Sequence, residues 1–274
     1  MTEKKRLNKK GLSRRVFIKR AAVGVAVGVA ATYGVTAMMQ KSNTDSTNVD
    51  MLTISDLELV SKIELRKEDS LIIVDMQNDF LPSGALPVNG GDEIISPINS
   101  LAEKFHNKGN TIVMTQDWHP PGHHSFASSH NKDPFEPFES EGIGPILWPD
   151  HCVQGSKGAE FHPDIEAKSA NAIIRKGFRP NVDSYSTFIE NDMKTYTGLS
   201  GLLNTLGIKR IFLCGLALDY CVYYSAIDGR NLGFDVVIPI DLSKSIDSPP
   251  GHLSNALQKM MDEGVQFVKS DNIV

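Results

Sequence analysis

The chain has 274 residues, of which 41% are hydrophobic, and it carries 28 Lys and Arg against 33 Asp and Glu. Nine of the basic residues and one Glu fall within residues 1–20, so the remainder of the chain holds 19 basic and 32 acidic side chains, a formal charge of −13. An acidic domain of this kind disfavours nucleic-acid binding and favours small-molecule chemistry.

The first 39 residues have the pattern of an export signal. Ser13-Arg14-Arg15-Val16-Phe17-Ile18-Lys19 resembles the twin-arginine motif, and residues 21–39 are uncharged and rich in Ala, Val and Gly. A basic region followed by a mildly apolar one is the order of a secretory signal, and Val35-Thr36-Ala37 offers a cleavage site. We expect export to the periplasm by the twin-arginine translocation machinery. An uncleaved membrane anchor is the alternative, although the stretch is barely long enough.

Residues 40–69 are expected to form a polar linker and a short extension that includes one helix, and residues 70–274 a single domain. Strand and helix patterns alternate through this domain, which predicts an α/β fold with a mainly parallel six-stranded sheet flanked by helices in three layers. The expected strands are 71–75, 111–116, 171–176, 210–216, 235–240 and 265–269. The expected helices lie near 93–108, 198–206, 221–232 and 251–263. Loops at 117–170 are long for a compact domain, which favours a functional site there.

A carboxylate follows the first apolar strand. The run Ile72 to Phe80 reads Ile-Ile-Val-Asp-Met-Gln-Asn-Asp-Phe, so the strand delivers Asp75 to its carboxyl end. Ligands of open α/β sheets bind at that edge, which makes Asp75 a catalytic candidate. Alone, an Asp in this position is more often a turn or helix-cap residue, so the interpretation depends on partners elsewhere.

The long loops carry a candidate metal site. Asp117 and His119 are separated by one residue, so their side chains share a face of an extended segment, and His151 would complete a set of two imidazoles and one carboxylate. Such a set suits one divalent transition metal, Zn, Fe or Mn, with open positions for water or substrate. His123 is either an outer neighbour or an additional ligand. The other loop histidines are interpreted as polar surface.

Two more strand ends supply a cation and a thiol. Lys176 follows the apolar stretch 172–174, and Cys221 follows the strand 210–216 and begins a helical segment. A thiol in the first turn of a helix, with a lysine nearby, is expected to have a lowered pKa and to be nucleophilic. Each residue alone has a simpler interpretation, as a surface charge or a small core residue, but three such groups at three strand ends favour catalysis.

Six segments in this order resemble the nicotinamidase/pyrazinamidase branch of the isochorismatase-like cysteine hydrolases. They are Val-Asp-Met-Gln-Asn-Asp-Phe at 74–80, Gln-Asp-Trp-His-Pro at 116–120, Ser-Phe-Ala-Ser-Ser-His at 125–130, Trp-Pro-Asp-His-Cys-Val-Gln-Gly at 148–155, Arg-Lys-Gly at 175–177 and Gly-Leu-Ala-Leu-Asp-Tyr-Cys-Val at 215–222. The resemblance covers about residues 70–274, and the order of the six is far more specific than any one alone.

The resemblance implies a role for each matching position. It implies a catalytic triad of Asp75, Lys176 and Cys221, with the backbone N–H groups of Ala217 and Cys221 as the oxyanion hole and a cis peptide bond between Leu216 and Ala217. It also implies a metal bound by Asp117, His119 and His151. The residues implied to contact the substrate ring are Phe80, Trp148 and, less closely matched, Tyr185.

The expected activity is hydrolysis of nicotinamide to nicotinate and ammonia through a cysteine thioester, a step of NAD salvage in pyridine nucleotide metabolism. The sequence leaves open whether pyrazinamide is also hydrolysed, and no nucleotide or organic cofactor is expected. The alternatives are an enzyme of the same fold acting on another amide, carbamoyl or ureido compound, and a non-enzymatic exported protein that binds a metal or ligand. The sequence leaves open whether the chain forms a homo-oligomer.

Overall fold

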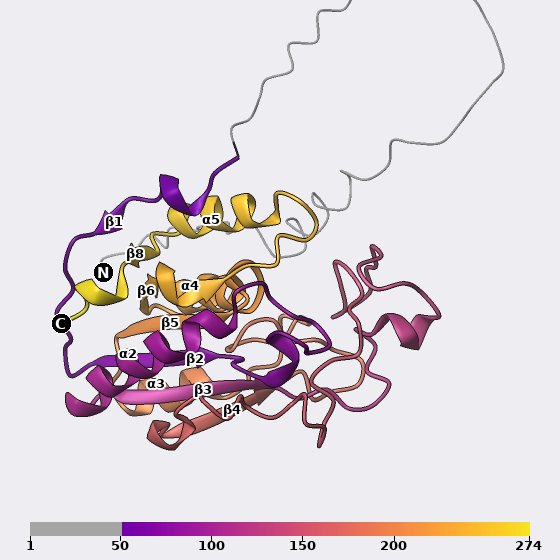
Figure 1. The fold of residues 1–274 in the computed structure, drawn as a ribbon, viewed down its shortest axis with the longest axis horizontal. Helices are drawn as coiled ribbons and strands as arrows, with labels where there is room; N and C mark the ends of the chain where they lie inside the picture. Colours follow the sequence, from indigo (N-terminus) through magenta and orange to yellow (C-terminus); the bar gives the residue numbers. More distant parts are fainter. Residues whose placement is uncertain (1–50) are drawn as a thin grey trace, which may run out of the picture. The chain divides into compact units, whose positions relative to one another are not determined.

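The computed structural model describes residues 51–274 (Figure 1). The export signal predicted at residues 1–39 and residues 40–50 of the predicted linker therefore lie outside the described residues. Within the described part, no helix combines the length and the apolar character needed to cross a bilayer.

The core is a parallel sheet whose strands follow the order β1-β8-β6-β5-β2-β3-β4, with β7 paired to β5. The strands are β1 Leu59–Val60, β2 Asp69–Val74, β3 Thr111–Asp117, β4 Ala172–Lys176, β5 Arg210–Leu216, β6 Asp235–Pro239, β7 Ser243–Lys244 and β8 Gln266–Val268. The central strands β2 and β5 are buried along their whole length, because both faces of a parallel sheet are covered. The edge strand β4 instead alternates in exposure.

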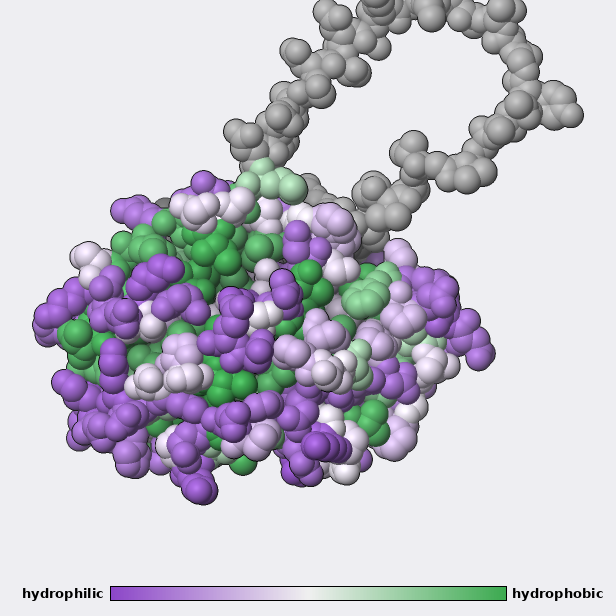
Figure 2. Space-filling model, in the orientation of Figure 1, coloured by the Kyte–Doolittle hydropathy of each residue, from purple (hydrophilic) through white to green (hydrophobic). Residues whose placement is uncertain are grey.

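Four α-helices flank this sheet in the described part of the chain: α2 Ile95–Asn107, α3 Leu199–Thr205, α4 Tyr223–Asn231 and α5 His252–Asp262. Helix α2 packs on β2 and β3, whereas α4 packs against β5, β6 and α5. Buried Ile98, Leu101, Ala102 and Phe105 recur at helical spacing along α2, which explains why that segment forms an amphipathic helix. The visible surface in Figure 2 is predominantly hydrophilic, as the acidic composition predicts.

The predicted α/β fold is confirmed, with two differences of detail. The sheet has eight strands instead of six, because β1 and β7 are only two residues long and leave no periodic signal. The extension before β2 forms a 3₁₀ turn, Ile54–Asp56, and then β1, which pairs with β8. This extension is therefore part of the sheet and does not lie outside the core.

Most of the long segment between β3 and β4 gathers at one end of the sheet, to the right in Figure 1, before the chain returns to the start of β4. It is held by its own backbone pairings, His119 with Val153 and Phe126 with Trp148, and by short 3₁₀ turns at Ala127–His130 and Ala167–Ser169. This end of the sheet carries the predicted functional residues.

Candidate active site and metal centre

Four adjacent strands deliver charged and nucleophilic residues to the same edge of the sheet. Asp75 follows β2, Asp117 and Lys176 end β3 and β4 in register with one another, and Cys221 follows β5. All four side chains are buried. The order β5-β2-β3-β4 thus brings together residues that are up to 146 positions apart in the sequence.

Asp75 is fixed in an unusual backbone conformation at the end of β2. Its φ of 50° lies in the left-handed region, which is uncommon for a residue with a Cβ and is often found at functional sites. Thr115 donates a hydrogen bond of 2.6 Å to Asp75 Oδ1. Burial raises the pKa of the Asp75 carboxyl above its ordinary value, although Lys176 opposes the shift. A carboxylate of this kind is suited to accept and return a proton.

Lys176 is the central cation of the site. Its Nζ lies 2.8 Å from Asp75 Oδ2, donates to Asp117 Oδ1 at 2.5 Å and to the Ser184 carbonyl at 3.0 Å, and lies 3.4 Å from Cys221 Sγ. Burial alone would lower the pKa of Lys176, but the two carboxylates outweigh it and the pKa rises well above its usual value. The ammonium therefore stays charged.

Cys221 lies in a π-helical turn, Leu218–Val222, that leads directly into α4. Burial raises the pKa of its thiol well above the ordinary value, and Asp75 and Asp117 raise it further, whereas Lys176 lowers it. The predicted lowering of this pKa is therefore wrong: desolvation and two carboxylates outweigh one ammonium. The predicted nucleophile is consequently a thiol that needs a base, and the buried Asp75, whose carboxylate contacts the same Lys176 ammonium, is in place to act as one.

The predicted oxyanion-hole residues lie beside this thiol. Ala217 and Cys221 both line the same pocket, and the peptide bond between Leu216 and Ala217 is cis, as the resemblance implies. The three cysteines of the chain, Cys152, Cys214 and Cys221, are buried and free.

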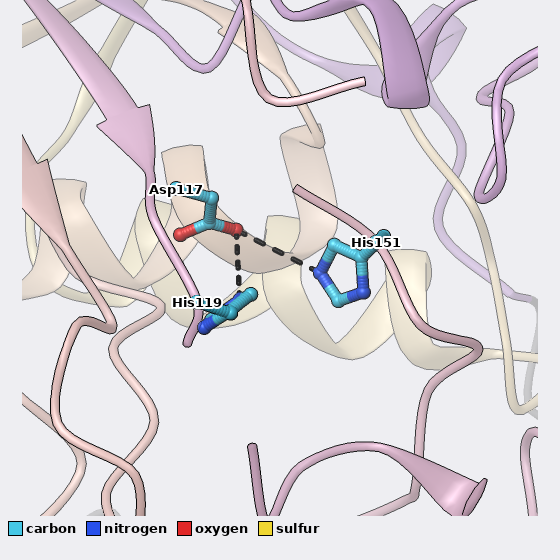
Figure 3. A group of neighbouring side chains, drawn as sticks. All are labelled: Asp117, His119 and His151. Atoms are coloured by element: carbon cyan, nitrogen blue, oxygen red, sulfur yellow. Dashed lines mark ion pairs between the residues drawn. The ribbon is translucent and has the colours of Figure 1, made fainter. Parts of the chain in front are cut away.

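The predicted metal ligands converge on one point (Figure 3). Asp117 Oδ2 lies 3.7 Å from His119 Nε2 and 3.9 Å from His151 Nε2, and all three side chains are buried. Two ligand atoms bound to one zinc ion are at most about 4.2 Å apart, twice the usual zinc–ligand distance. The spacing of the three atoms therefore fits a shared ion.

The hydrogen bonds of the two imidazoles assign their tautomers. Nδ1 of His119 bonds the Gly177 carbonyl at 2.8 Å, and Nδ1 of His151 bonds the Pro149 carbonyl at 2.8 Å, so each Nδ1 carries the proton and each Nε2 presents a lone pair. Two lone pairs facing a carboxylate oxygen form a donor set for a cation. Burial lowers the pKa of His151 to about 4, which keeps that ring neutral. Burial also lowers the pKa of His119, but Asp117 outweighs it and the net shift is upward.

His123 is placed as a neighbour of this centre. Its Nε2 lies 2.9 Å from the Arg179 carbonyl, its Nδ1 lies 2.7 Å from Ser125 Oγ, and its ring is 4.4 Å from that of His119. Both nitrogens are thus engaged away from Asp117. Asp183, which the sequence did not single out, has a carboxylate oxygen within 4.8 Å of ring nitrogens of His119 and His123.

The pocket beside Cys221 contains the three predicted ring-contacting residues. Phe80, Trp148 and Tyr185 are buried and line it. Trp148 Nε1 donates to Tyr185 Oη at 3.0 Å, and Tyr185 in turn donates to the Gly144 carbonyl at 3.0 Å. These bonds fix the two rings as walls of an aromatic cavity.

Sequence reasoning missed four further residues of the pocket lining. They are Leu86, Asp183, Tyr220 and Ile246. Tyr220 precedes the nucleophile and Asp183 is seven residues after Lys176, so their positions offered a signal. Leu86 and Ile246 are apolar loop residues that belong to none of the six motifs, and no pattern marked them.

Comparison with known proteins places the chain among related hydrolases. The sequence model of the isochorismatase domain matches residues 69–271. The nicotinamidase of Acinetobacter baylyi is 46% identical over 217 residues, which cover 77% of this chain and 99% of that protein.

Two solved structures are similar along the same region. PnC1 of L. infantum in complex with nicotinate has 39% identity and a TM-score of 0.66, covering 80% of this chain and 98% of that one. The pyrazinamidase of Pyrococcus horikoshii in complex with zinc has 38% identity and a TM-score of 0.61, covering 74% and 99%.

Proposed function

This chain belongs to the isochorismatase domain family, and we propose that it hydrolyses nicotinamide to nicotinate and ammonia, a step that feeds NAD salvage. The single observation that carries the proposal is the contact of Lys176 with Cys221, Asp75 and Asp117, beside an aromatic pocket that Cys221 and Asp117 line. A similar protein has been solved with nicotinate, the product of this reaction.

In the first half of the reaction, Asp75 takes the proton of the Cys221 thiol as Sγ adds to the carboxamide carbon. The N–H groups of Ala217 and Cys221 stabilise the oxyanion. When the tetrahedral species collapses, Asp75 gives its proton to the departing nitrogen and ammonia leaves. The C–N bond is then replaced by a thioester on Cys221.

In the second half, a water molecule attacks the thioester. Asp75, now ionised, takes one proton of that water, and collapse breaks the C–S bond, returns this proton to the sulfur and leaves the acid, which releases the second proton of the water to solvent as nicotinate. Lys176 stays protonated throughout and balances the charge that passes between Asp75 and Cys221. Its burial makes this stabilisation stronger than it would be in water.

We also propose that Asp117, His119 and His151 hold one divalent transition metal, either Zn, Fe or Mn. When bound, the ion would supply a Lewis-acidic position that orients the ring nitrogen of the substrate. The lone-pair arrangement of the three side chains supports this assignment, and the zinc complex of the similar pyrazinamidase is consistent with it.

The test is release of ammonia and nicotinate from nicotinamide by the purified full chain, with pyrazinamide as a second substrate. Cys221→Ala is expected to lose at least about 1,000-fold in kcat/KM. Cys214→Ala, a buried thiol in β5, is the matched control and keeps its activity. A metal-loaded, folded protein that releases no ammonia from nicotinamide would redirect the proposal to another amide, carbamoyl or ureido substrate.

For the amino-terminal segment, we propose export by the twin-arginine machinery to the periplasm, supported by Arg14, Arg15 and the apolar run that follows. Fractionation of cells that express the full chain tests it. The double variant Arg14→Lys, Arg15→Lys is expected to stay in the cytoplasm. N-terminal sequencing of the exported protein distinguishes cleavage after Ala37 from a retained anchor.

A further inference from the structure

The segment 245–251, between β7 and α5, forms part of the pocket wall. We call it the strap. Its residue Ile246 lines the cavity beside Cys221 and is half-buried. The cavity offers about 20 Å³ to the centre of a water molecule, which is room for roughly one water. An aromatic amide can therefore bind only if the pocket wall moves. The position of Ile246 in this wall affects which substrates fit.

The strap is tied to the turn that carries the nucleophile. Asp219, two residues before Cys221, is completely buried, and its Oδ1 and Oδ2 accept the backbone N–H groups of Ile246 at 3.0 Å and Asp247 at 2.7 Å. Tyr220 donates its hydroxyl to the Ser248 carbonyl at 2.5 Å. Three successive strap residues are thus held by two successive residues of the turn.

The same ties reach the aromatic wall and α5. The Tyr220 ring packs 4.9 Å from Trp148 and 5.4 Å from Tyr185 and stacks 4.4 Å from His252 in the first turn of α5. Asp247 Oδ1 accepts the backbone N–H of Leu253 at 3.0 Å. Because the strap is anchored at both the turn and the helix, its position relative to Cys221 is fixed by packing and not by the chain connectivity alone.

We propose that Ile246 is a specificity-determining residue that limits the size of the ring accepted beside Cys221, and that Asp219 is a positioning residue that holds Ile246 there. The inference rests on the proposed amidase function of the same pocket. Asp219 does not touch the reacting atoms; it acts by fixing two backbone N–H groups of the strap. A buried carboxylate that accepts backbone N–H groups makes strong, directional bonds, which suits this role.

The test compares nicotinamide with quinoline-3-carboxamide, which carries a second fused ring. In Ile246→Ala, the kcat/KM for the larger amide relative to nicotinamide is expected to rise at least about tenfold, the scale at which small changes in pocket volume discriminate substrates. Ile173→Ala, a half-exposed isoleucine on the edge strand β4, is the matched control and leaves the ratio unchanged. An unchanged ratio in Ile246→Ala overturns the proposal.

Asp219 is tested by a double-mutant cycle on the same ratio. Asp219→Ala is expected to raise the ratio alone but to add nothing in the Ile246→Ala background, because both changes remove the same wall. A merely structural role would change kcat for both substrates equally and leave the ratio as it was. Because Asp219→Ala removes a buried group and threatens folding, the result for Ile246→Ala decides the specificity claim by itself.

Alkylation of Cys221 gives a readout that does not require turnover. The rate with N-phenylmaleimide relative to N-ethylmaleimide is expected to rise in Ile246→Ala, with Cys221→Ala giving the background from the other two cysteines. A changed alkylation ratio in a protein that hydrolyses no amide would keep the strap proposal and reject the amidase. If the protein hydrolyses nicotinamide but Ile246→Ala changes neither ratio, the amidase proposal stands and the strap proposal is rejected.

Discussion

Lys176 Nζ donates a hydrogen bond to Asp117 Oδ1 at 2.5 Å, while the other oxygen of the same carboxylate faces His119 and His151. Asp117 is thus shared between the cation beside Cys221 and the candidate metal centre. Lys176 lowers the pKa of Asp117 below its usual range against the opposing effect of burial, so this carboxylate is ionised. The nucleophile and the metal centre are therefore coupled through one ion pair.

Lys176→Met is expected to lower both the catalytic activity and the stability of the protein. Without the ammonium, kcat/KM falls at least about 100-fold, and the metal-free protein loses about 3–5 kcal/mol of stability because two buried carboxylates lose their counter-charge. Turnover and urea unfolding of the metal-free protein measure the two effects. Lys209→Met, an exposed lysine before β5, is the control and changes neither. Wild-type stability in Lys176→Met would contradict the coupling.

The fall of kcat/KM at acid pH should reflect the pKa of Asp75. Its pKa is raised by burial, and a base works only when ionised, so kcat/KM is full above this pKa and falls as the pH drops through it. Thr115→Val removes a 2.6 Å hydrogen bond that lowers this pKa, so the acid limb is expected to move up by about one pH unit.

Thr111→Val, at the opposite end of β3, should leave the acid limb of kcat/KM where it is. The metal content of each variant is measured across the same pH range, because protonation of the histidines would also end activity. An acid limb that does not move in Thr115→Val, at equal metal content, would remove Asp75 from the role of base.

A glycine supports the metal centre by leaving room for an imidazole. A Cβ at Gly177 would lie 2.5 Å from His119 Cε1, and the φ of Gly177 is 66°. Gly177→Ala is expected to displace His119 and weaken metal affinity by about 10–100-fold, the usual effect of disturbing a ligand's support. The measurement is the dissociation constant for Zn²⁺ by competition with a chelating dye.

A substitution at Gly177 has two effects, backbone strain at a positive φ and a clash with His119, and Gly109→Ala serves to separate them. Gly109 has a φ of 75° and open space where its Cβ would be, so the variant bears only the backbone cost of about 1–2 kcal/mol. We expect both variants to unfold more easily and only Gly177→Ala to lose Zn²⁺ affinity. Equal affinity in the two would mean that His119 is not a ligand.

The sequence alone predicted the parts of the fold that show a hydrophobic periodicity or carry a motif. The central strand β2 contains the apolar run 71–74 and α2 has apolar residues at helical spacing, so both elements can be located from the hydrophobic pattern. Asp75, Lys176 and Cys221 were identified because each lies at or after the carboxyl end of a strand. The parallel order of the strands then brings these three together.

Other features depend on tertiary context that no local pattern encodes. Ile246 belongs to the pocket only because Asp219 holds the strap, a contact between segments 27 residues apart. The Cys221 pKa was mispredicted because a helix start and a lysine are visible in the sequence, whereas desolvation is not. The two-residue strands β1 and β7 exist only because a sheet edge and β5 are there to pair with them.

The hydrogen bond from Trp148 to Tyr185 should matter more for substrate binding than for chemistry. Tyr185→Phe removes the hydroxyl that accepts from Trp148 Nε1 and donates to the Gly144 carbonyl, and so leaves two buried polar groups without their partner. The cost is about 1–3 kcal/mol of stability, and the freed Trp148 ring should raise KM for nicotinamide more than it lowers kcat. Tyr196→Phe, a largely exposed tyrosine, is the control and leaves both constants unchanged. A fall confined to kcat would instead place Tyr185 in the chemical step, because a wall that only orients the ring acts on ground state and transition state alike.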